Sequence, residues 1–194
     1  MEVLEAIKSR RSIRRYKTTP VDDKTVEVVL EAARWAPSWA NTQCWRFIVV
    51  RDRAIKARVA DTLSKTKRPD GTISNNVATK AVLEAPVLIV ACAEMSKSGC
   101  NRNDGTPLTD KGGYWYMFDV ALAMQNLVLA AHSLGLGTVI VGNFDAQRAA
   151  AVLKVAEGFC VVAMTPLGYF AQEPGPAPKR KELSEIVFYD KYGT

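Results

Sequence analysis

YWYMFDVALAMQNLVLAAHSLGLG, residues 114–137, is the stretch that decides the architecture of this chain. Apolar residues recur in it at helical spacing, with Met117, Met124 and Val128 on one stripe and leucines on others. A helix that is apolar on nearly every side is buried on most sides. We expect Gly135 to end this helix as a C-cap. Because a domain of 194 residues can hardly surround such a helix alone, the sequence predicts that it helps to form a dimer interface.

Shorter segments on both sides alternate between helical and extended patterns. The alternation has no repeat and no interdomain linker, so it predicts one layered domain of α/β type over residues 1–194. The tail, from about 174 to 194, is first rich in Pro and Gly and then regains apolar residues, which favours an arm that leaves the body and docks elsewhere. The first expected helix lies within 3–11 and ends near the arginines, and the second lies within 21–37, between a cap at Asp22 or Asp23 and Pro37 just past its end. The other expected helices are 55–63, 77–84 and 145–155, and the expected strands are 45–51, 86–93, 138–142 and 159–169. The expected loops are 65–76, predicted to be mobile, and 95–113, predicted to be functional because of its length.

Bulk composition excludes several classes of protein. A hydrophobic content of 48% and a charged content of 24% are typical of globular chains. The N-terminus carries Glu2 and Glu5 and has no signal-peptide core, and the longest apolar runs are too short to cross a bilayer. We therefore expect a cytoplasmic protein without a membrane partner. Four widely spaced cysteines and a single histidine, His132, predict no metal site, no disulfide framework and no histidine-based catalytic triad.

Arginine is concentrated in SRRSIRRY, residues 9–16, and a second basic cluster, PKRK, occupies residues 178–181. The planar guanidinium fork suits phosphate and carboxylate oxygens, so two clusters distant in sequence could converge on one phosphate. The alternative is a solvated, charged face. A net charge of +6 is also compatible with weak binding to nucleic acid, but the chain has no nucleic-acid-binding motif, and we expect no such partner.

A second polar segment, APSWANTQCWRF, covers residues 36–47. This segment places Ser38, Asn41 and Gln43 among tryptophans. Amides and hydroxyls beside aromatic rings can bind a flat heteroaromatic ligand through hydrogen bonds and ring stacking. The alternative is a simple helix-to-strand turn. The glycines of GLGTVIVG, 135–142, close a helix rather than open one, so they are no dinucleotide loop. The chain has few candidate acid–base groups but two segments, 9–16 and 36–47, that are suited to bind a ligand. This combination favours an enzyme in which a bound cofactor carries out the chemistry.

Taken in order, these segments resemble the FMN-dependent nitroreductase family. The resemblance runs from RRSIRRY through AARWAPSWANTQCWRF, DVALAMQNLVLAAHSLGLGTVIVGNFD and VVAMTPLGY to PKRKELSEIV, and so covers nearly the whole chain. It implies an α+β, nitroreductase-like fold in which helices flank a central, mainly antiparallel sheet. It also implies an intertwined homodimer with a swapped C-terminal arm.

The resemblance further implies the roles of particular residues. FMN would be the bound cofactor and NAD(P)H a co-substrate, with hydride passing through flavin N5 to an electron-poor acceptor such as a nitroaromatic or a quinone. Arg14 would also stabilise the reduced flavin, and no side chain would be catalytic in its own right. The alternative is another reaction on the same fold: reductive dehalogenation, enone reduction, dehydrogenation or flavin cleavage. The implied cofactor-binding residues are Arg10, Arg11, Ser12 and Arg14; Ser38, Asn41 and Gln43 from the partner chain; Val141 and Gly142 near flavin N5; and Lys179 and Arg180 at the phosphate.

This chain departs from the family pattern at several positions. Cys44 stands where the family often has proline, and it either packs or acts as a reactive thiol. A family Asn and Lys align poorly here: Ala78 and Ala81 occupy their positions, with Lys80 adjacent, so the sequence assigns no residue to that flavin contact. Loop 95–113 would determine the choice of substrate. The resemblance assigns no cofactor contact to Arg15, which is expected to be a surface or salt-bridge residue.

Overall fold

A computed structural model describes residues 1–67 and 69–193. The sequence positions the ends of several elements through caps. Asp22 accepts a hydrogen bond from the Thr25 backbone N–H at the start of α2, and Asp52 and Asp145 do the same for α3 and α6. The elements are α1 Val3–Ser9, α2 Asp23–Arg34, η1 Trp39–Asn41, β1 Trp45–Val50, α3 Arg53–Ala60, β2 Thr66–Lys67, β3 Ile73–Ser74, α4 Thr79–Glu84, β4 Val87–Glu94, η2 Gly112–Tyr114, α5 Trp115–Ser133, β5 Leu136–Thr138, α6 Ala146–Leu153, β6 Phe159–Tyr169 and η3 Leu183–Glu185.

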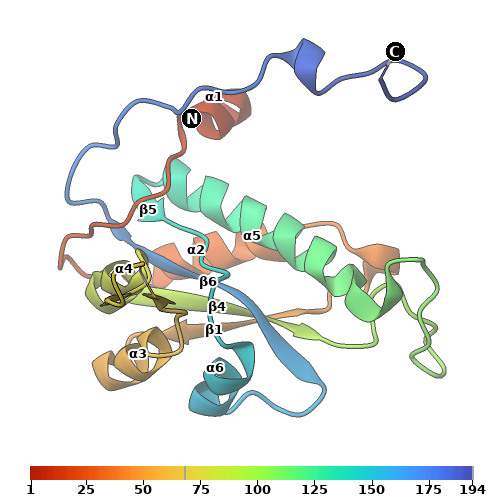
Figure 1. The fold of residues 1–194 in the computed structure, drawn as a ribbon, viewed down its shortest axis with the longest axis horizontal. Helices are drawn as coiled ribbons and strands as arrows, with labels where there is room; N and C mark the ends of the chain where they lie inside the picture. Colours follow the sequence, from red (N-terminus) through yellow and green to blue (C-terminus); the bar gives the residue numbers. More distant parts are fainter. Residues whose placement is uncertain (68, 194) are drawn as a thin grey trace.

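The main sheet has four strands in the order β1-β4-β6-β5, and every neighbouring pair is antiparallel. Helices α2 and α5 cover one face, and α3, α4 and α6 cover the other (Figure 1). The expected α+β architecture is therefore confirmed. The alternation of helices and strands along the chain predicted the layers, but the antiparallel pairing was beyond what that alternation could indicate.

Strand β4 lies in the middle of the layers and is buried on both faces. Ile89 and Ala91 pack with α2 and α5, while Leu88 and Val90 pack with the helices of the opposite face. Burial on both sides explains why the run PVLIVACA is continuously apolar and does not alternate. Two hydrophobic cores, one on each face of the sheet, result from this arrangement.

Helix α5 is buried on one side only in the single chain. Val120, Ala123 and Leu127 are inaccessible to solvent, whereas Met117 and Phe118 are about half exposed. The expectation of burial on most sides is thus met only on the side that faces the sheet and α2. The exposed apolar stripe is the feature that the predicted dimer interface would cover, and the dimer stays a prediction.

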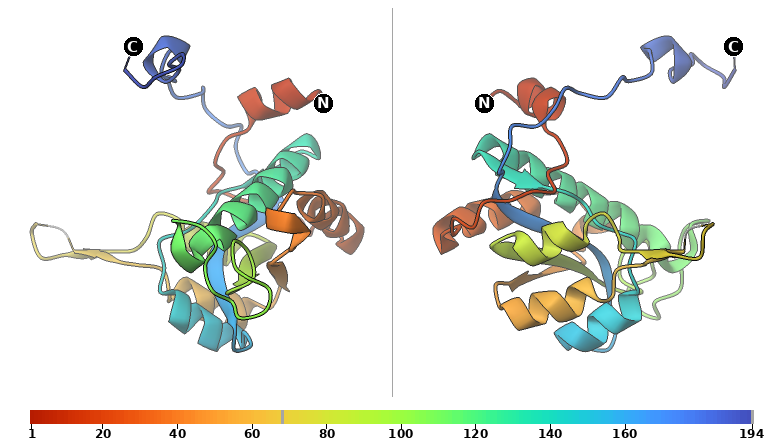
Figure 2. Two further views of the ribbon diagram at one scale, coloured as in Figure 1. Left: turned by 90° about the vertical axis from the view of Figure 1, so that its right-hand side faces the viewer. Right: turned by 60° about the vertical axis from the view of Figure 1, so that its left-hand side comes forward.

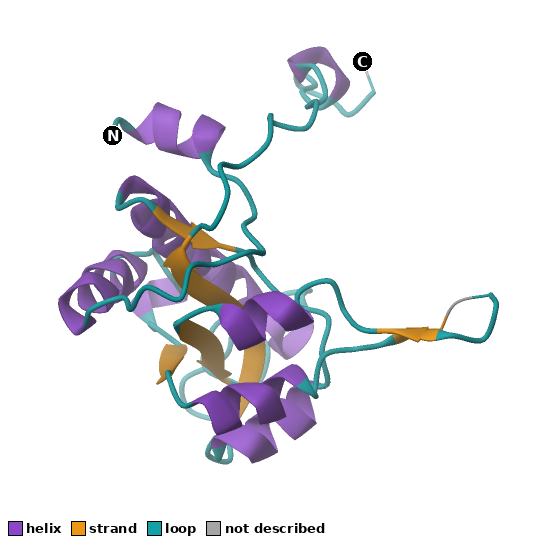
Figure 3. Cartoon of the chain, turned by 90° about the vertical axis from the view of Figure 1, so that its left-hand side faces the viewer, coloured by secondary structure: helices purple, strands orange, loops and turns teal. Residues whose placement is uncertain are grey.

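Two expected elements differ from the structure. Residues 65–76 were expected to be a loop, but β2 and β3 pair there as a short antiparallel hairpin that projects from the body (Figures 2 and 3). Arg68, which belongs to the expected loop, lies outside the described residues. Residues 138–142 were expected to be a strand, but β5 ends at Thr138, and beyond it only Val141 forms an isolated bridge, to Met164. The sequence TVIVG has strand composition, yet its continuous pairing with β6 stops at Thr138.

The C-terminal segment, residues 171–193, is exposed along its whole length. It passes α1 and extends away from the helical layers to η3 (Figure 1). Leu183, Ile186 and Phe188 carry exposed apolar surface there, as Leu4 does on α1. No described helix has the length and apolar character needed to cross a membrane. An arm whose described apolar residues are exposed fits the predicted exchange between subunits, which stays a prediction.

Candidate functional site

The arginine-rich segment is held by the edge of the main sheet. The Ile13 N–H donates to the Thr138 carbonyl at 2.8 Å, and the Lys17 N–H donates to the Tyr169 carbonyl at 2.8 Å. The Ala171 N–H donates in turn to the Arg15 carbonyl at 3.0 Å, so the beginning of the C-terminal arm runs beside the same segment. These backbone bonds fix the positions from which the arginine side chains emerge.

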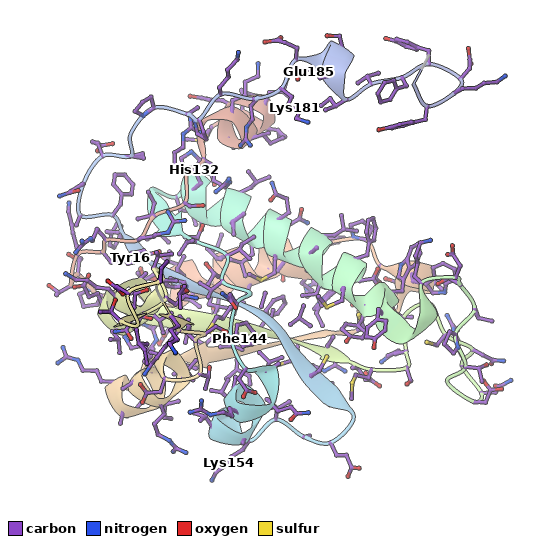
Figure 4. All side chains as sticks on the ribbon, in the orientation of Figure 1. Tyr16, His132, Phe144, Lys154, Lys181 and Glu185 are labelled. Atoms are coloured by element: carbon purple, nitrogen blue, oxygen red, sulfur yellow. The ribbon has the colours of Figure 1, made fainter. Side chains whose placement is uncertain are left out.

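Two further contacts lock this segment against the sheet. A Cβ on Gly137 would lie 2.7 Å from the Cβ of Ile13, so only glycine permits this approach of the two backbones. Tyr16, labelled in Figure 4, is 6% exposed and its hydroxyl donates to the Ile13 carbonyl at 2.6 Å. Burial raises the pKa of the Tyr16 phenol, which therefore stays neutral and acts as a fixed donor.

The arginines and the beginning of the arm enclose a cavity of about 480 Å³. One wall is the segment 10–15 and the other is the Pro-rich stretch that starts the arm. The convergence of two basic clusters that the sequence suggested is therefore present within one chain. The lining residues are Arg10, Arg11, Ser12, Ile13, Arg14, Arg15, Gln172, Glu173, Pro174, Gly175, Pro176, Pro178 and Arg180. We call this cavity the arginine pocket.

Positive charge exceeds negative charge in the arginine pocket, which is lined by five arginines and one glutamate. Among the described residues, none of its five arginines forms an ion pair, and Glu173 in its wall forms none either. Arg11 donates through Nη1 to the carbonyls of Lys8 and Arg10, while its buried Nε has no partner. Burial first, and then the charges of Arg11 and Arg180, lower the pKa of Arg10. A pocket of this kind is suited to a multiply charged anion.

The predicted phosphate-binding residues are distributed unevenly around the arginine pocket. Arg10, Arg11, Ser12, Arg14 and Arg180 all line it, whereas the neighbouring Lys179 does not. Arg15, expected to be a surface or salt-bridge residue, is exposed, has no ion pair in the described structure and also lines this pocket. The sequence could not assign it because the pocket forms only where the segment bonded to the sheet and the beginning of the arm lie side by side in the fold.

The turn of residues 38–43 occupies a different place from the arginine pocket. Asn41 lines a second cavity, of about 500 Å³, together with Glu94, Lys97 and Arg102. One chain does not bring Ser38, Asn41 and Gln43 to the arginines, and the family resemblance assigned these three residues to the partner chain. Their convergence with the arginines therefore depends on the predicted dimer.

The backbone of this turn is strained. Ala40, Asn41 and Gln43 have φ values of 44°, 55° and 47°, in the left-handed region that non-glycine residues rarely adopt. Each such residue costs on the order of 1–3 kcal/mol and persists only when its surroundings hold it. The Ser38 hydroxyl accepts a hydrogen bond from the Gln43 N–H at 3.0 Å and closes the turn. A strained, polar turn beside a cavity is typical of a binding site.

Asp119 is a functional candidate that sequence reasoning missed. Its carboxylate is 1% exposed and accepts hydrogen bonds from the Trp39 N–H at 3.1 Å, the Ser98 hydroxyl and the Cys44 thiol at 3.8 Å. The available signal was the one acidic residue inside the apolar helix 115–133. Burial and the charge of Asp119 raise the pKa of Cys44 to about 12, which favours packing over a reactive thiol.

The remaining site predictions fall near the sheet. Val141 is buried and exchanges two backbone hydrogen bonds with Met164, which leaves the next residue, Gly142, exposed at the surface. Ala78 and Ala81 are buried in the core beneath α3 and offer no polar contact, while the nearby Lys80 is ion-paired with Glu84.

His132 connects two helices near the arginine pocket (Figure 4). Its Nε2 lies 2.7 Å from the Ser9 hydroxyl, so the histidine of α5 is tied to the end of α1. Burial, and then Arg10 and Arg11, lower the pKa of His132. This environment favours a structural role for His132. Among the described residues, no cluster of His, Cys, Asp and Glu could hold a metal ion.

The structure thus combines layered helices on an antiparallel sheet with a pocket of five arginines whose charge is suited to a multiply charged anion. The family model described as "Nitroreductase family" matches residues 7–169, and the chain belongs to that family. A protein of Methanothermobacter thermautotrophicus, provisionally named NADH dehydrogenase/NAD(P)H nitroreductase, is 34% identical over 179 residues, which are 90% of this chain and 81% of that relative.

Further relatives show the range of named activities. The 5,6-dimethylbenzimidazole synthase of Rhodospirillum rubrum is 31% identical, with 90% of this chain and 84% of the relative covered. The crystal structure of a nitroreductase family protein from Clostridium novyi NT is 30% identical, with a TM-score of 0.74 over 100% of this chain and 96% of that one. The resemblance to the family that the sequence suggested is therefore confirmed.

Proposed function

We propose that this protein is an FMN-dependent NAD(P)H oxidoreductase that acts as a homodimer on an electron-poor acceptor such as a nitroaromatic or a quinone. The observation that carries the proposal is the arginine pocket, whose five guanidinium groups have no ion-pair partner in the described structure. The family name, and the names of relatives that include NAD(P)H nitroreductases, support the reaction class.

The donor set fits the phosphate of FMN. A phosphate monoester carries almost two negative charges and three acceptor oxygens at neutral pH. The buried, unpartnered Nε of Arg11 would gain an acceptor. Burial, and then the charges of Arg11 and Arg180, lower the Arg10 pKa, and a bound dianion would offset both effects. Ser12 lies between these arginines and adds a neutral donor for the ribityl chain. Arg10, Arg11 and Arg180 would therefore bind the phosphate end, with Lys179 assisting from the arm.

The remaining predicted contacts would orient the flavin ring. Arg14 would lie at the pyrimidine edge, where its charge stabilises the negative charge of the reduced ring. Ser38, Asn41 and Gln43 of the second subunit would contribute hydrogen bonds, and the backbone at Val141 and Gly142 would lie near the reacting edge. When bound, FMN supplies two-electron hydride chemistry that the side chains of this chain do not themselves provide.

Assembly as a homodimer is part of this proposal. The exposed apolar stripe of α5, the exposed apolar residues of α1 and the undocked arm all need a covering surface, and a second copy of the chain would supply one. Cover by the partner would also exclude water from the cofactor ring. A location in the cytoplasm is our expectation for such an enzyme.

A different reaction on the same fold is the second candidate. The relatives include the 5,6-dimethylbenzimidazole synthase named above and an iodotyrosine dehalogenase 1 homolog of Caenorhabditis elegans at 26% identity. These names favour keeping reductive dehalogenation, enone reduction, dehydrogenation and flavin cleavage as alternatives to the reduction of nitroaromatics and quinones.

Stopped-flow absorbance tests the proposal. The purified protein, reconstituted with FMN, is mixed with NADH or NADPH and then with nitroaromatics, quinones, a halotyrosine or oxygen. We expect rapid bleaching of the flavin band by at least one nicotinamide and rapid reoxidation by a nitroaromatic or a quinone. A protein that binds no FMN contradicts the whole proposal. Slow reduction by both nicotinamides contradicts the NAD(P)H part and favours the second candidate.

A further inference from the structure

Asp119 receives donors from two separate segments of the chain. It lies in the second turn of α5, with 1% of its surface exposed, and no cation among the described residues pairs with it. The Trp39 N–H comes from the strained turn, and the Ser98 hydroxyl comes from loop 95–113. A buried carboxylate is costly unless such donors satisfy it, so the carboxylate and the two segments stabilise one another.

Turn 38–43 depends on outside support for its shape. Its left-handed residues are not glycines, so the backbone would relax if it were released. Asp119 holds the turn at the Trp39 N–H, and the Arg102 guanidinium of loop 95–113 donates to the Ala40 carbonyl at 3.3 Å. The turn is thus held at two adjacent residues, once by α5 and once by the loop.

Loop 95–113 is itself packed against the start of α5, where Figure 1 shows it entering the helix. A Cβ on Gly99 would lie 2.5 Å from the Trp115 Cβ, so the loop backbone rests directly on that tryptophan. The Trp115 ring meets the Trp39 ring edge to face, with centroids 5.0 Å apart. The turn, the loop and the first turns of α5 therefore form one packed unit around the Asp119 carboxylate.

We propose that Asp119 is a positioning residue that holds turn 38–43 in the shape required for contact with the cofactor and couples it to loop 95–113. The inference rests on the proposed function, because FMN is the ligand that the turn would contact. It deepens that function by linking the loop expected to choose the acceptor with the turn expected to bind the flavin. A substitution in loop 95–113 should therefore change the affinity for FMN, although the loop does not line the arginine pocket.

Three variants of the full-length protein test this role. Asp119→Ala removes the acceptor, Asp119→Asn retains one oxygen for the Trp39 N–H, and Asp110→Asn is the control at an exposed carboxylate paired with Lys111. Near-UV circular dichroism of the apoprotein reports the Trp39–Trp115 pair without FMN. Fluorescence titration gives the FMN Kd, and visible circular dichroism reports the protein environment around the bound flavin ring.

We expect Asp119→Ala to lose the tryptophan signal and to raise the FMN Kd about tenfold, as the loss of one charge-assisted hydrogen bond predicts. Asp119→Asn should recover the Kd to within about threefold of the wild type, because a neutral hydrogen bond remains. Asp110→Asn should change neither measurement. A folded Asp119→Ala variant with the wild-type FMN Kd and the wild-type visible spectrum overturns the proposal.

Ser98→Ala covers the case in which Asp119→Ala does not fold. This variant keeps the carboxylate and removes only the donor from the loop, and it should raise the FMN Kd about threefold and change the KM for the acceptor. An unchanged FMN Kd and an unchanged KM overturn the coupling. Failure of the wild type to bind FMN contradicts the proposed function instead, and the near-UV signal of the apoprotein variants still decides whether Asp119 holds the turn.

Discussion

Gly137→Ala is predicted to damage the arginine pocket without touching an arginine. The new Cβ would lie 2.7 Å from both the Cβ and the Cγ2 of Ile13, whereas nonbonded carbon atoms prefer about 3.5–4.0 Å. Segment 10–17 would therefore have to move by roughly 1 Å. It cannot do so freely, because the Ile13 N–H is bonded to Thr138, the next residue of the same strand.

The energetic cost follows from two opposing effects. Overpacking of a fixed site costs typically 1–3 kcal/mol. Replacing glycine by alanine gains back about 0.4–1 kcal/mol by restricting the unfolded chain. Because the steric effect is larger, the free energy of unfolding should fall by about 1–2 kcal/mol. Displacement of the guanidinium groups should also weaken FMN binding about tenfold, the equivalent of one charge-assisted hydrogen bond.

Urea denaturation of the apoprotein and titration with FMN measure the two effects. Gly113→Ala is the matched control, because a Cβ there meets nothing within 4 Å. The double variant Ile13→Ala/Gly137→Ala should be less destabilised than the sum of the single variants, since it removes two of the three crowded atoms. Equal stability and an equal FMN Kd in Gly137→Ala and Gly113→Ala would refute the steric reasoning.

Three further predictions follow from the environments of single residues. With a pKa of about 12, the Cys44 thiol is almost fully protonated at pH 8, so iodoacetamide should modify it only after unfolding; rapid modification of the native protein, read by peptide mass mapping, would contradict this. The pKa of His132 is lowered in the folded state, so the unfolded chain binds more protons just below its ordinary value of 6.5, and the free energy of unfolding should fall as pH drops through and below 6.5. His132→Gln should flatten that dependence in urea titrations, and an unchanged slope would count against the assignment. Arg14→Ala should weaken FMN binding and lower the flavin reduction potential, and an unchanged potential in a dye-equilibration titration would exclude the electrostatic role.

Local chemistry made much of the fold predictable. Helix α2 was readable from its Asp22 cap and its apolar stripe, and β4 from a run of apolar residues too short for most helices. The hairpin at 66–74 was missed because its residues are polar and Pro-Asp-Gly also marks a loop. The strand expected at 138–142 was wrong because β-sheet composition does not reveal where a neighbouring strand stops offering partners.

The candidate site was predictable where residue type alone indicates a ligand. Guanidinium groups in two clusters suggested an anion, and the arginine pocket brings Arg10, Arg11, Arg14 and Arg180 together. Asp119 was not predictable in this way, because its role depends on donors from two segments that are adjacent only after folding. The place of Arg15 in the pocket likewise follows from the pinned backbone and not from the sequence around it.

The central claim is that the arginine pocket binds the phosphate of FMN, and it is tested most directly by comparing FMN with riboflavin in equilibrium titrations. The wild type should prefer FMN about 100-fold, as two charge-assisted hydrogen bonds to phosphate predict. Arg11→Gln should lose most of this preference while its affinity for riboflavin stays unchanged. Arg148→Gln, at an exposed arginine outside the pocket, should keep the preference. Equal affinities of the wild type for FMN and riboflavin would contradict the claim.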